Sequence, residues 1–209
     1  MPVVVPIRSL GPGHRERIAA HLKELDQDDR YLRFGYPARD EQIERYVDSI
    51  DFERDDVFGI FNRKLEMIAM AHLAYSENAE MSACAEFGVS VLSKARGKGF
   101  GARLFDRAVM HARNEGVEIL FIHALSENHV MLRIATKAGA KLERAGGETE
   151  AYLRVLPATF DSHMAEIIEE QLAQTDYRIK SQAKLFGSFL AGVREVRDGV
   201  RAGRHKSAS

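Results

Sequence analysis

Apolar and polar positions in the first half of the chain predict two helices followed by a run of strands. Periodic apolar positions favour a short opening strand at residues 3–8 and helices at residues 15–25 and from Asp40, the expected N-cap. Apolar runs separated by polar turns then predict antiparallel strands at residues 57–61, 65–75 and 81–91. The aromatic and basic stretch 28–37 is interpreted as a packed connection between the helices.

The second half of the chain alternates strands with helices. A helix begins near Gly101 and is broken by Gly116, a buried strand covers residues 117–124, and a helix over residues 128–139 is ended by glycine. Closing strands are expected at residues 141–144 and 149–156. The predicted fold class is therefore mixed α/β, with a glycine-rich loop at the carboxyl end of a central strand, where open sheets bind ligands.

After Pro157 the pattern is helical only. One apolar stripe contains Met164, Ile167, Ile168 and Leu172, and a longer one contains Ile179, Phe186, Phe189, Val193, Val196 and Val200. We divide the chain into a domain at residues 1–156, a helical extension at 157–200 and a basic disordered tail at 201–209. The extension is interpreted as a helical pair that covers the domain's own surface; the alternative is an interface for a homo-oligomer or another partner.

Composition and charge narrow the class of protein. Of the 209 residues, 45% are hydrophobic and 29% charged, which is typical of a globular protein with a substantial core. A net charge of -1 gives no general attraction to nucleic acid or to an anionic membrane, and no apolar run reaches spanning length, so neither partner is expected. The one cysteine, Cys84, cannot form an internal disulfide, which favours a cytoplasmic protein. No metal site is predicted.

The most informative stretch is the loop Arg96-Gly97-Lys98-Gly99-Phe100-Gly101-Ala102, which separates an apolar strand from a helix. Glycine lets the backbone approach a ligand closely, and a helix N-terminus offers unpaired N–H groups and a partial positive charge. We therefore expect a pyrophosphate on the amides of this loop, with positive charge added by Arg96 and Lys98. A P-loop is excluded because its pattern is absent. The relaxed dinucleotide pattern ending at Ala102 is present, but the acidic residue that should close the next strand is not.

The pattern Arg96-x-x-Gly99-x-Gly101 resembles the phosphate loop of the GNAT family of acyl-CoA-dependent N-acyltransferases. A second signature of that family is similar to Asn128-x-x-Met131-Leu132 followed by Lys137-Ala138-Gly139-Ala140. Segments 29–34 and 85–87 resemble the GNAT domain of bacterial protein-lysine acetyltransferases. The resemblance covers residues 1–156 and implies the GNAT fold, a central, mostly antiparallel sheet flanked by helices. It also implies that residues 28–37 border the acceptor pocket.

The resemblance implies acetyl-CoA as co-substrate and gives roles to four residues. Glu86 would be the general base, because an alkylammonium with a pKa near ~10.4 is mostly protonated at neutral pH and cannot attack. We expect burial beside Phe87 to raise the pKa of Glu86. Backbone groups of Val89 and Val91 would bind the acyl carbonyl and the pantetheine arm, which Asn128 would also contact. A surface glutamate and a helix cap are the alternative interpretations of Glu86 and Asn128.

Several positions leave parts of the chemistry open. In many GNAT enzymes a tyrosine protonates the leaving thiolate, but this chain has Ala135 there, so the general acid is unassigned. The aromatic residue that follows Lys-x-Gly in the family is replaced by Ala140. His72 and His123, on the predicted strands that flank the central strand, are rival bases or substrate contacts, although each is more typical of a hydrogen-bonded core histidine.

These observations predict an N-acetyltransferase that moves an acetyl group from acetyl-CoA to a primary amine by direct attack in a ternary complex. The acceptor is either a protein lysine or a small-molecule amine. The alternative is a non-catalytic acyl-CoA-binding module whose C-terminal helices engage a partner. The sequence does not define the acceptor, the acyl length or the oligomeric state.

Overall fold

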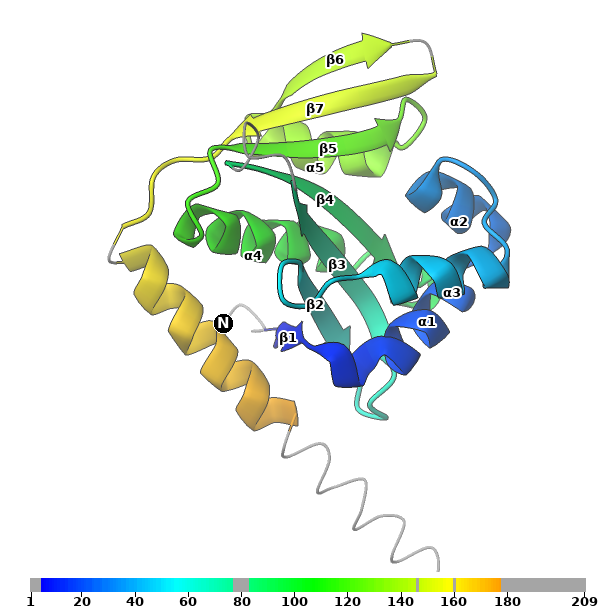
Figure 1. Cartoon of the computed structure of the whole chain (residues 1–209), viewed down its shortest axis with the longest axis horizontal. Helices are drawn as coiled ribbons and strands as arrows, with labels where there is room; N and C mark the ends of the chain where they lie inside the picture. The colour runs from blue at the N-terminus through cyan, green and yellow to red at the C-terminus, as the bar shows by residue number, and fades with distance from the viewer. Residues whose placement is uncertain (1–4, 77–82, 146, 160, 178–209) are drawn as a thin grey trace, which may run out of the picture.

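One seven-stranded sheet, with strand order β1-β2-β3-β4-β5-β7-β6, forms the centre of the protein (Figure 1). The computed structural model describes residues 5–76, 83–145, 147–159 and 161–177. The strands are β1 Arg8–Leu10, β2 Asp56–Phe61, β3 Met67–Tyr75, β4 Cys84–Val91, β5 Ile119–Leu125, β6 Lys141–Ala145 and β7 Glu148–Arg154. Neighbouring strands are antiparallel except β4 and β5, which are parallel. The predicted mixed α/β class is confirmed.

Helices cover both faces of this sheet. They are α1 Arg15–Lys23, α2 Gln27–Phe34, α3 Asp40–Ser49, α4 Phe100–Asn114 and α5 His129–Lys137, with short 3-10 turns η1 Pro12–His14 and η3 Ser93–Ala95. Side chains of a strand alternate between faces. On β4, Phe87 packs edge-to-face on Phe105 of α4, whereas Ser90 hydrogen-bonds His21 of α1. The α1–α3 layer and α4 therefore lie on opposite faces.

Three predictions of local structure are wrong. Of the opening strand expected at residues 3–8, residues 5–7 are not strand and residues 3 and 4 lie outside the described residues; β1 is Arg8–Leu10. The N-cap of α3 is Arg39 rather than Asp40. The stretch expected to be a connection contains α2 instead. Asp26 caps this helix by accepting a hydrogen bond from the Asp29 N–H at 2.8 Å, and Gly35 ends it at a φ of 78°.

Residues 161–177 form a further helix, which lies beside the domain and is drawn yellow to orange in Figure 1. Its Glu166 accepts hydrogen bonds from three side chains of α4: Arg107 (2.6 Å), His111 and Asn114. The predicted apolar stripe is not what packs on the domain, because Met164, Ile167, Ile168 and Leu172 are 41%, 55%, 54% and 51% exposed. The helix thus attaches through a different face, which carries Glu166 together with the buried Ala173 and with Tyr177, whose ring packs on Phe61. The second predicted stripe and the tail lie outside the described residues.

None of the helices within the described ranges combines the length and apolar character needed to span a bilayer.

The contact between His111 and Glu166 depends on pH. Burial alone would lower the pKa of His111, but hydrogen bonds to Asp56 (2.8 Å) and Glu166 raise it to about 9. Burial alone would raise the pKa of Glu166, but hydrogen bonds from His111, Arg107 and Asn114 lower it to about 2. The stability from His111 is complete below its ordinary pKa of 6.5 and is lost as pH rises through about 9. The stability from Glu166 is present above its ordinary pKa of 4.5 and is lost as pH falls towards 2.

We predict that a His111→Gln variant unfolds at a lower temperature than the wild type, with the largest difference at a pH of about 5.5, where both groups are charged in the folded state. The difference should shrink as pH rises to about 9.5, because the wild type then loses the imidazolium. Thermal unfolding followed by circular dichroism measures this. Glu169→Gln is the matched control, since Glu169 is half exposed and 3.9 Å from Arg107. A difference that does not vary with pH would contradict the account.

Candidate functional site

Strands β4 and β5 run together only where they begin. Their pairs are Cys84↔Ile119, Ala85↔Leu120 and Glu86↔Phe121. Both strands continue beyond these pairs, to Val91 and Leu125, with no further pairing between them across their fully described lengths. The strands therefore diverge, as Figure 1 shows. A free strand edge presents unpaired N–H and C=O groups, so this part of β4 can bind a ligand through its backbone.

The space between the diverging ends of β4 and β5 is called the gap here. The register of β3 and β4 determines which backbone groups of β4 face this gap. The Leu92 N–H donates to the Ile68 carbonyl at 3.0 Å, so this pair is a hydrogen-bonded one. Alternate residues of an antiparallel strand bond to the same neighbour. Ser90 and Gly88 therefore bond towards β3, and the intervening Val89 turns its N–H and C=O towards the gap. Val91 does the same at the end of the strand.

A cavity of about 360 Å³ opens at the gap. Its walls come from α2 and the residues after it, the middle of β4, the end of β5 and the start of α5; they include Arg33, Tyr36, Glu86, Val89, His123 and Asn128. Three of the residues predicted from the sequence, Glu86, Val89 and Asn128, thus meet at one cavity. Val91 and the glycine loop do not line it.

The glycine loop adjoins the same gap from the α4 side. Gly97 and Gly99 have φ angles of 76° and 74°, and Gly99 is the N-cap of α4. Because glycine has no side chain to cap the helix, the N–H groups of the first turn, at Phe100, Gly101 and Ala102, remain open to an anion. A Cβ on Gly101 would lie 3.8 Å from a methyl of Val91, so the loop begins where β4 ends.

The two basic residues of the loop differ. Lys98 is exposed. Arg96 forms an ion pair with Asp29 of α2, whose side chain is 7% exposed. The second carboxylate oxygen of Asp29 has no hydrogen-bond partner within the described residues. Since Asp29 offsets part of the Arg96 charge, Arg96 attracts a phosphate less strongly than an unpaired arginine would.

Glu86 stands where β4 and β5 part. Its side chain is exposed, so the predicted burial beside Phe87 is wrong. The two side chains point to opposite faces of the sheet: Phe87 packs on α4, while Glu86 faces the layer that contains α2. Glu86 is therefore open to the cavity and to water.

A chain of hydrogen-bonded side chains lies on the same face as Glu86. Arg33 donates to the Tyr46 hydroxyl at 2.7 Å, this hydroxyl lies 2.7 Å from His72 Nδ1, and His72 Nε2 lies 3.3 Å from Asp55. Burial, and then the charge of Arg33, lower the pKa of His72, so its imidazole is neutral at neutral pH. Burial also raises the pKa of Tyr46.

The two histidines predicted as rival bases occupy different environments. His72 is a buried, hydrogen-bonded histidine, as predicted for a core position. His123 is exposed and lines the cavity, so the core interpretation is wrong for it.

Arg33 and Tyr46 are the residues of this region that the sequence patterns missed. The mixture of basic and aromatic residues at 28–37 was the available signal, because it is typical of a ligand-pocket border. It could not show which of these side chains would face the cavity.

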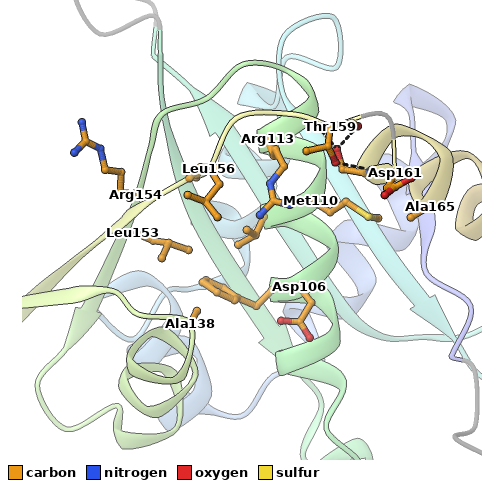
Figure 2. Close-up of a pocket in the computed structure, with 14 residues that line it drawn as sticks. Asp106, Met110, Arg113, Ala138, Leu153, Arg154, Leu156, Thr159, Asp161 and Ala165 are labelled. Carbon is orange, nitrogen blue, oxygen red and sulfur yellow. Dashed lines mark hydrogen bonds between the residues drawn. The ribbon is translucent and has the colours of Figure 1, made fainter.

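A larger cavity of about 520 Å³ lies away from the gap, between α4, the end of β7 and the start of the helix 161–177. Figure 2 shows Met110, Leu153 and Leu156 among its lining side chains, with Thr159 at one side. Thr159 and Ser162 exchange hydrogen bonds, in which the backbone N–H of each donates to the side-chain oxygen of the other. None of the residues predicted for catalysis or cofactor binding lines it. We therefore place the chemistry at the smaller cavity, where those residues meet.

The parallel strands of this mixed sheet thus part beside a glycine loop at a helix N-terminus. The chain belongs to the GNAT family: the family described as "Acetyltransferase (GNAT) domain" matches residues 7–141. Comparison with curated proteins finds no match.

Solved structures show the same fold. The GNAT domain of S. lividans PAT is 20% identical, with a TM-score of 0.61, over 73% of this chain and 94% of that one. Spermidine N-acetyltransferase from Vibrio cholerae, in complex with CoA and spermine, is 18% identical, with a TM-score of 0.58, over 73% and 96%. Ribosomal-protein-alanine N-acetyltransferase from Brucella melitensis is 16% identical, with a TM-score of 0.57, over 72% and 99%.

Asn128 has a structural role that can be separated from ligand binding. Its side-chain oxygen caps α5 by accepting from the Met131 N–H at 3.1 Å. We expect Asn128→Ala to lower the free energy of unfolding by about 1 kcal/mol, and Asn128→Asp, which keeps the acceptor, to lower it less. Urea denaturation measures both. Equal losses in the two variants would contradict the cap, whereas weaker CoA binding by a stable Asn128→Asp variant would indicate contact with the pantetheine.

Proposed function

We propose that this chain is an N-acetyltransferase that moves the acetyl group of acetyl-CoA to a primary amine. The amine attacks the thioester directly in a ternary complex, with Glu86 as general base. The observation that carries the proposal is the parting of β4 and β5, which leaves the Val89 and Val91 backbone unpaired beside a cavity. The adjoining uncapped helix N-terminus supplies an anion site.

Acetyl-CoA lies along the gap in this proposal. The amides of residues 97–102 bind its pyrophosphate, with charge from Lys98 and a weaker contribution from Arg96. The backbone of Val91 and the side chain of Asn128 bind the pantetheine arm. The Val89 N–H donates to the thioester carbonyl oxygen, where negative charge develops as the amine attacks.

The amine needs a base because an ammonium with a pKa near ~10.4 has no lone pair to attack with. Glu86 is exposed at the cavity and accepts the proton directly or through one water. The C–N bond forms, the C–S bond breaks, and CoA leaves as a thiolate. A thiol with a pKa near ~8.5 is a moderate leaving group, so water can protonate it. This matters because Ala135 is fully buried and supplies no acid.

Two kinds of acceptor fit a primary-amine enzyme. Among the structural neighbours, one is named for a polyamine and another for a ribosomal protein. A panel of amines and lysine peptides, assayed by release of the free CoA thiol, tests both. Binding of CoA without turnover of any acceptor would favour the non-catalytic acyl-CoA-binding module.

Glu86→Gln should lower turnover by ~10²–10⁴-fold, because the amide cannot take the proton from the amine. CoA affinity, measured by calorimetry, should be unchanged. Glu118→Gln is the control, since Glu118 is exposed and lies just before β5. Normal turnover in Glu86→Gln would remove Glu86 as the base.

Gly99→Ala should weaken CoA binding by roughly tenfold, because an L-residue at a φ of 74° costs about 1–2 kcal/mol and the loop would relax away from it. Gly11→Ala is the matched control, since a Cβ there also meets nothing within 4 Å and its φ is -122°. Calorimetric titration with CoA gives both affinities. Wild-type protein that gives no heat with CoA or acetyl-CoA would overturn the proposed function.

A further inference from the structure

Among the described residues that line the cavity at the gap, Arg33 is the only lysine or arginine. Its guanidinium rests on the backbone of β4: a Cβ placed on Gly88 would lie 2.5 Å from Nη2 and 2.7 Å from Cζ. Contacts this short mean that a side chain at position 88 would displace the guanidinium from this place. The absence of a side chain on Gly88 therefore allows a positive charge to lie against the middle of β4.

The groups that hold this guanidinium are neutral. Nη2 donates to the Tyr46 hydroxyl at 2.7 Å, and Cζ lies 5.2 Å and 5.4 Å from the ring centroids of Phe34 and Tyr46. No ion pair between Arg33 and a carboxylate occurs in the described part of the chain. A half-buried cation with no carboxylate within ion-pair distance is only partly compensated, and an anionic group on a ligand would compensate it further.

A negative group lies on the same wall. Glu86 and Gly88 are two residues apart on β4, so they share a face and their Cα atoms are separated by roughly 7 Å. The cavity wall thus carries a carboxylate at Glu86 and a guanidinium over Gly88. This arrangement is complementary to a molecule that has an amine at one end and an acid at the other.

The position of Arg33 argues against a role with the pyrophosphate. The glycine loop begins beyond Val91, which is three residues and roughly 10 Å along β4 from Gly88.

We propose that Arg33 binds a carboxylate of the acceptor, so that the preferred acceptors are primary amines with a carboxylate a few atoms from the nitrogen. The guanidinium N–H groups that do not bond Tyr46 can pair with both oxygens of such a group. This inference rests on the proposed function, in which Glu86 takes the proton from the same amine. The carboxylate can belong to a free amino acid or to an acidic residue beside a lysine in a peptide.

The test compares acceptors that differ only in the acid. The free-molecule arm pairs β-alanine with ethylamine and 4-aminobutyrate with propylamine, and the peptide arm pairs a lysine flanked by Asp with the same lysine flanked by Asn. Thiol release gives kcat/KM for each. We expect the wild type to favour the carboxylate member by ~10–100-fold in at least one arm, and Arg33→Gln to bring that ratio close to one. The arm that shows the preference identifies the source of the acid.

Three further variants keep the test decisive. Arg33→Lys should retain part of the preference, because it keeps the charge and loses the paired donors. Gly88→Ala should reduce the preference by displacing the guanidinium. This variant tests the same site if Arg33→Gln does not fold. Arg63→Gln, at an exposed turn position, should leave the ratio unchanged. A wild type without preference, or the full preference retained in Arg33→Gln, would overturn the assignment.

An equilibrium measurement separates this inference from the proposed function. Titration of the protein with CoA already bound, using the same amines, involves no acetyl transfer. Carboxylate-dependent binding that is lost in Arg33→Gln, together with absence of turnover for every acceptor, would overturn the enzyme assignment and keep the Arg33 site. Turnover without a carboxylate preference would keep the enzyme assignment and overturn the Arg33 site.

Discussion

The parting of β4 and β5 is the constraint on which the rest of the site depends. Each strand keeps a complete ladder on its other side: β4 pairs with β3 over its length, and β5 pairs with β7 from Ile119 to Leu125. The two strands can therefore separate without losing their place in the sheet. The cost is a row of unpaired backbone groups at Val89 and Val91, which water or a ligand must satisfy. The cavity and the adjoining glycine loop both lie along this free edge.

Helix α2 connects the two parts of the site. Asp29 and Arg33 are four residues apart, so they lie on one side of the helix. Asp29 pairs with Arg96 at the glycine loop, and Arg33 rests on Gly88 in the cavity. A ligand that drew Arg96 away from Asp29 would leave a buried carboxylate without its partner, which is unfavourable. The same short helix therefore contributes a charged group to each part of the site.

The parts of the site that depend on residues close together in the sequence could be predicted from it. The glycines before an apolar helix identified the loop, and two of them have positive φ angles in the structure. The alternation of side chains along a strand predicted that Glu86 and Gly88 share one face. The rest needed contacts between distant segments. Helix α2 has only eight residues and depends on one cap at Asp26, so its apolar pattern was too short to read. The role of Arg33 could not be predicted, because it depends on contact with Gly88, which lies 55 positions further along the chain.

The helix at residues 161–177 shows why periodicity cannot choose the buried face. Its apolar stripe is as regular as that of a core helix, yet the face that packs on the domain carries Glu166 and Glu170, with Ser162 and Ala173 buried beside them. One reason is Arg107, which is 3% exposed and pairs with Glu166 at 2.6 Å and Glu170 at 3.6 Å. Removing the partners of a buried charge typically destabilises a fold by about 3–5 kcal/mol, and Arg107 lies beside the ring of Phe58. The need to neutralise Arg107 therefore favours this face of the helix over the apolar stripe.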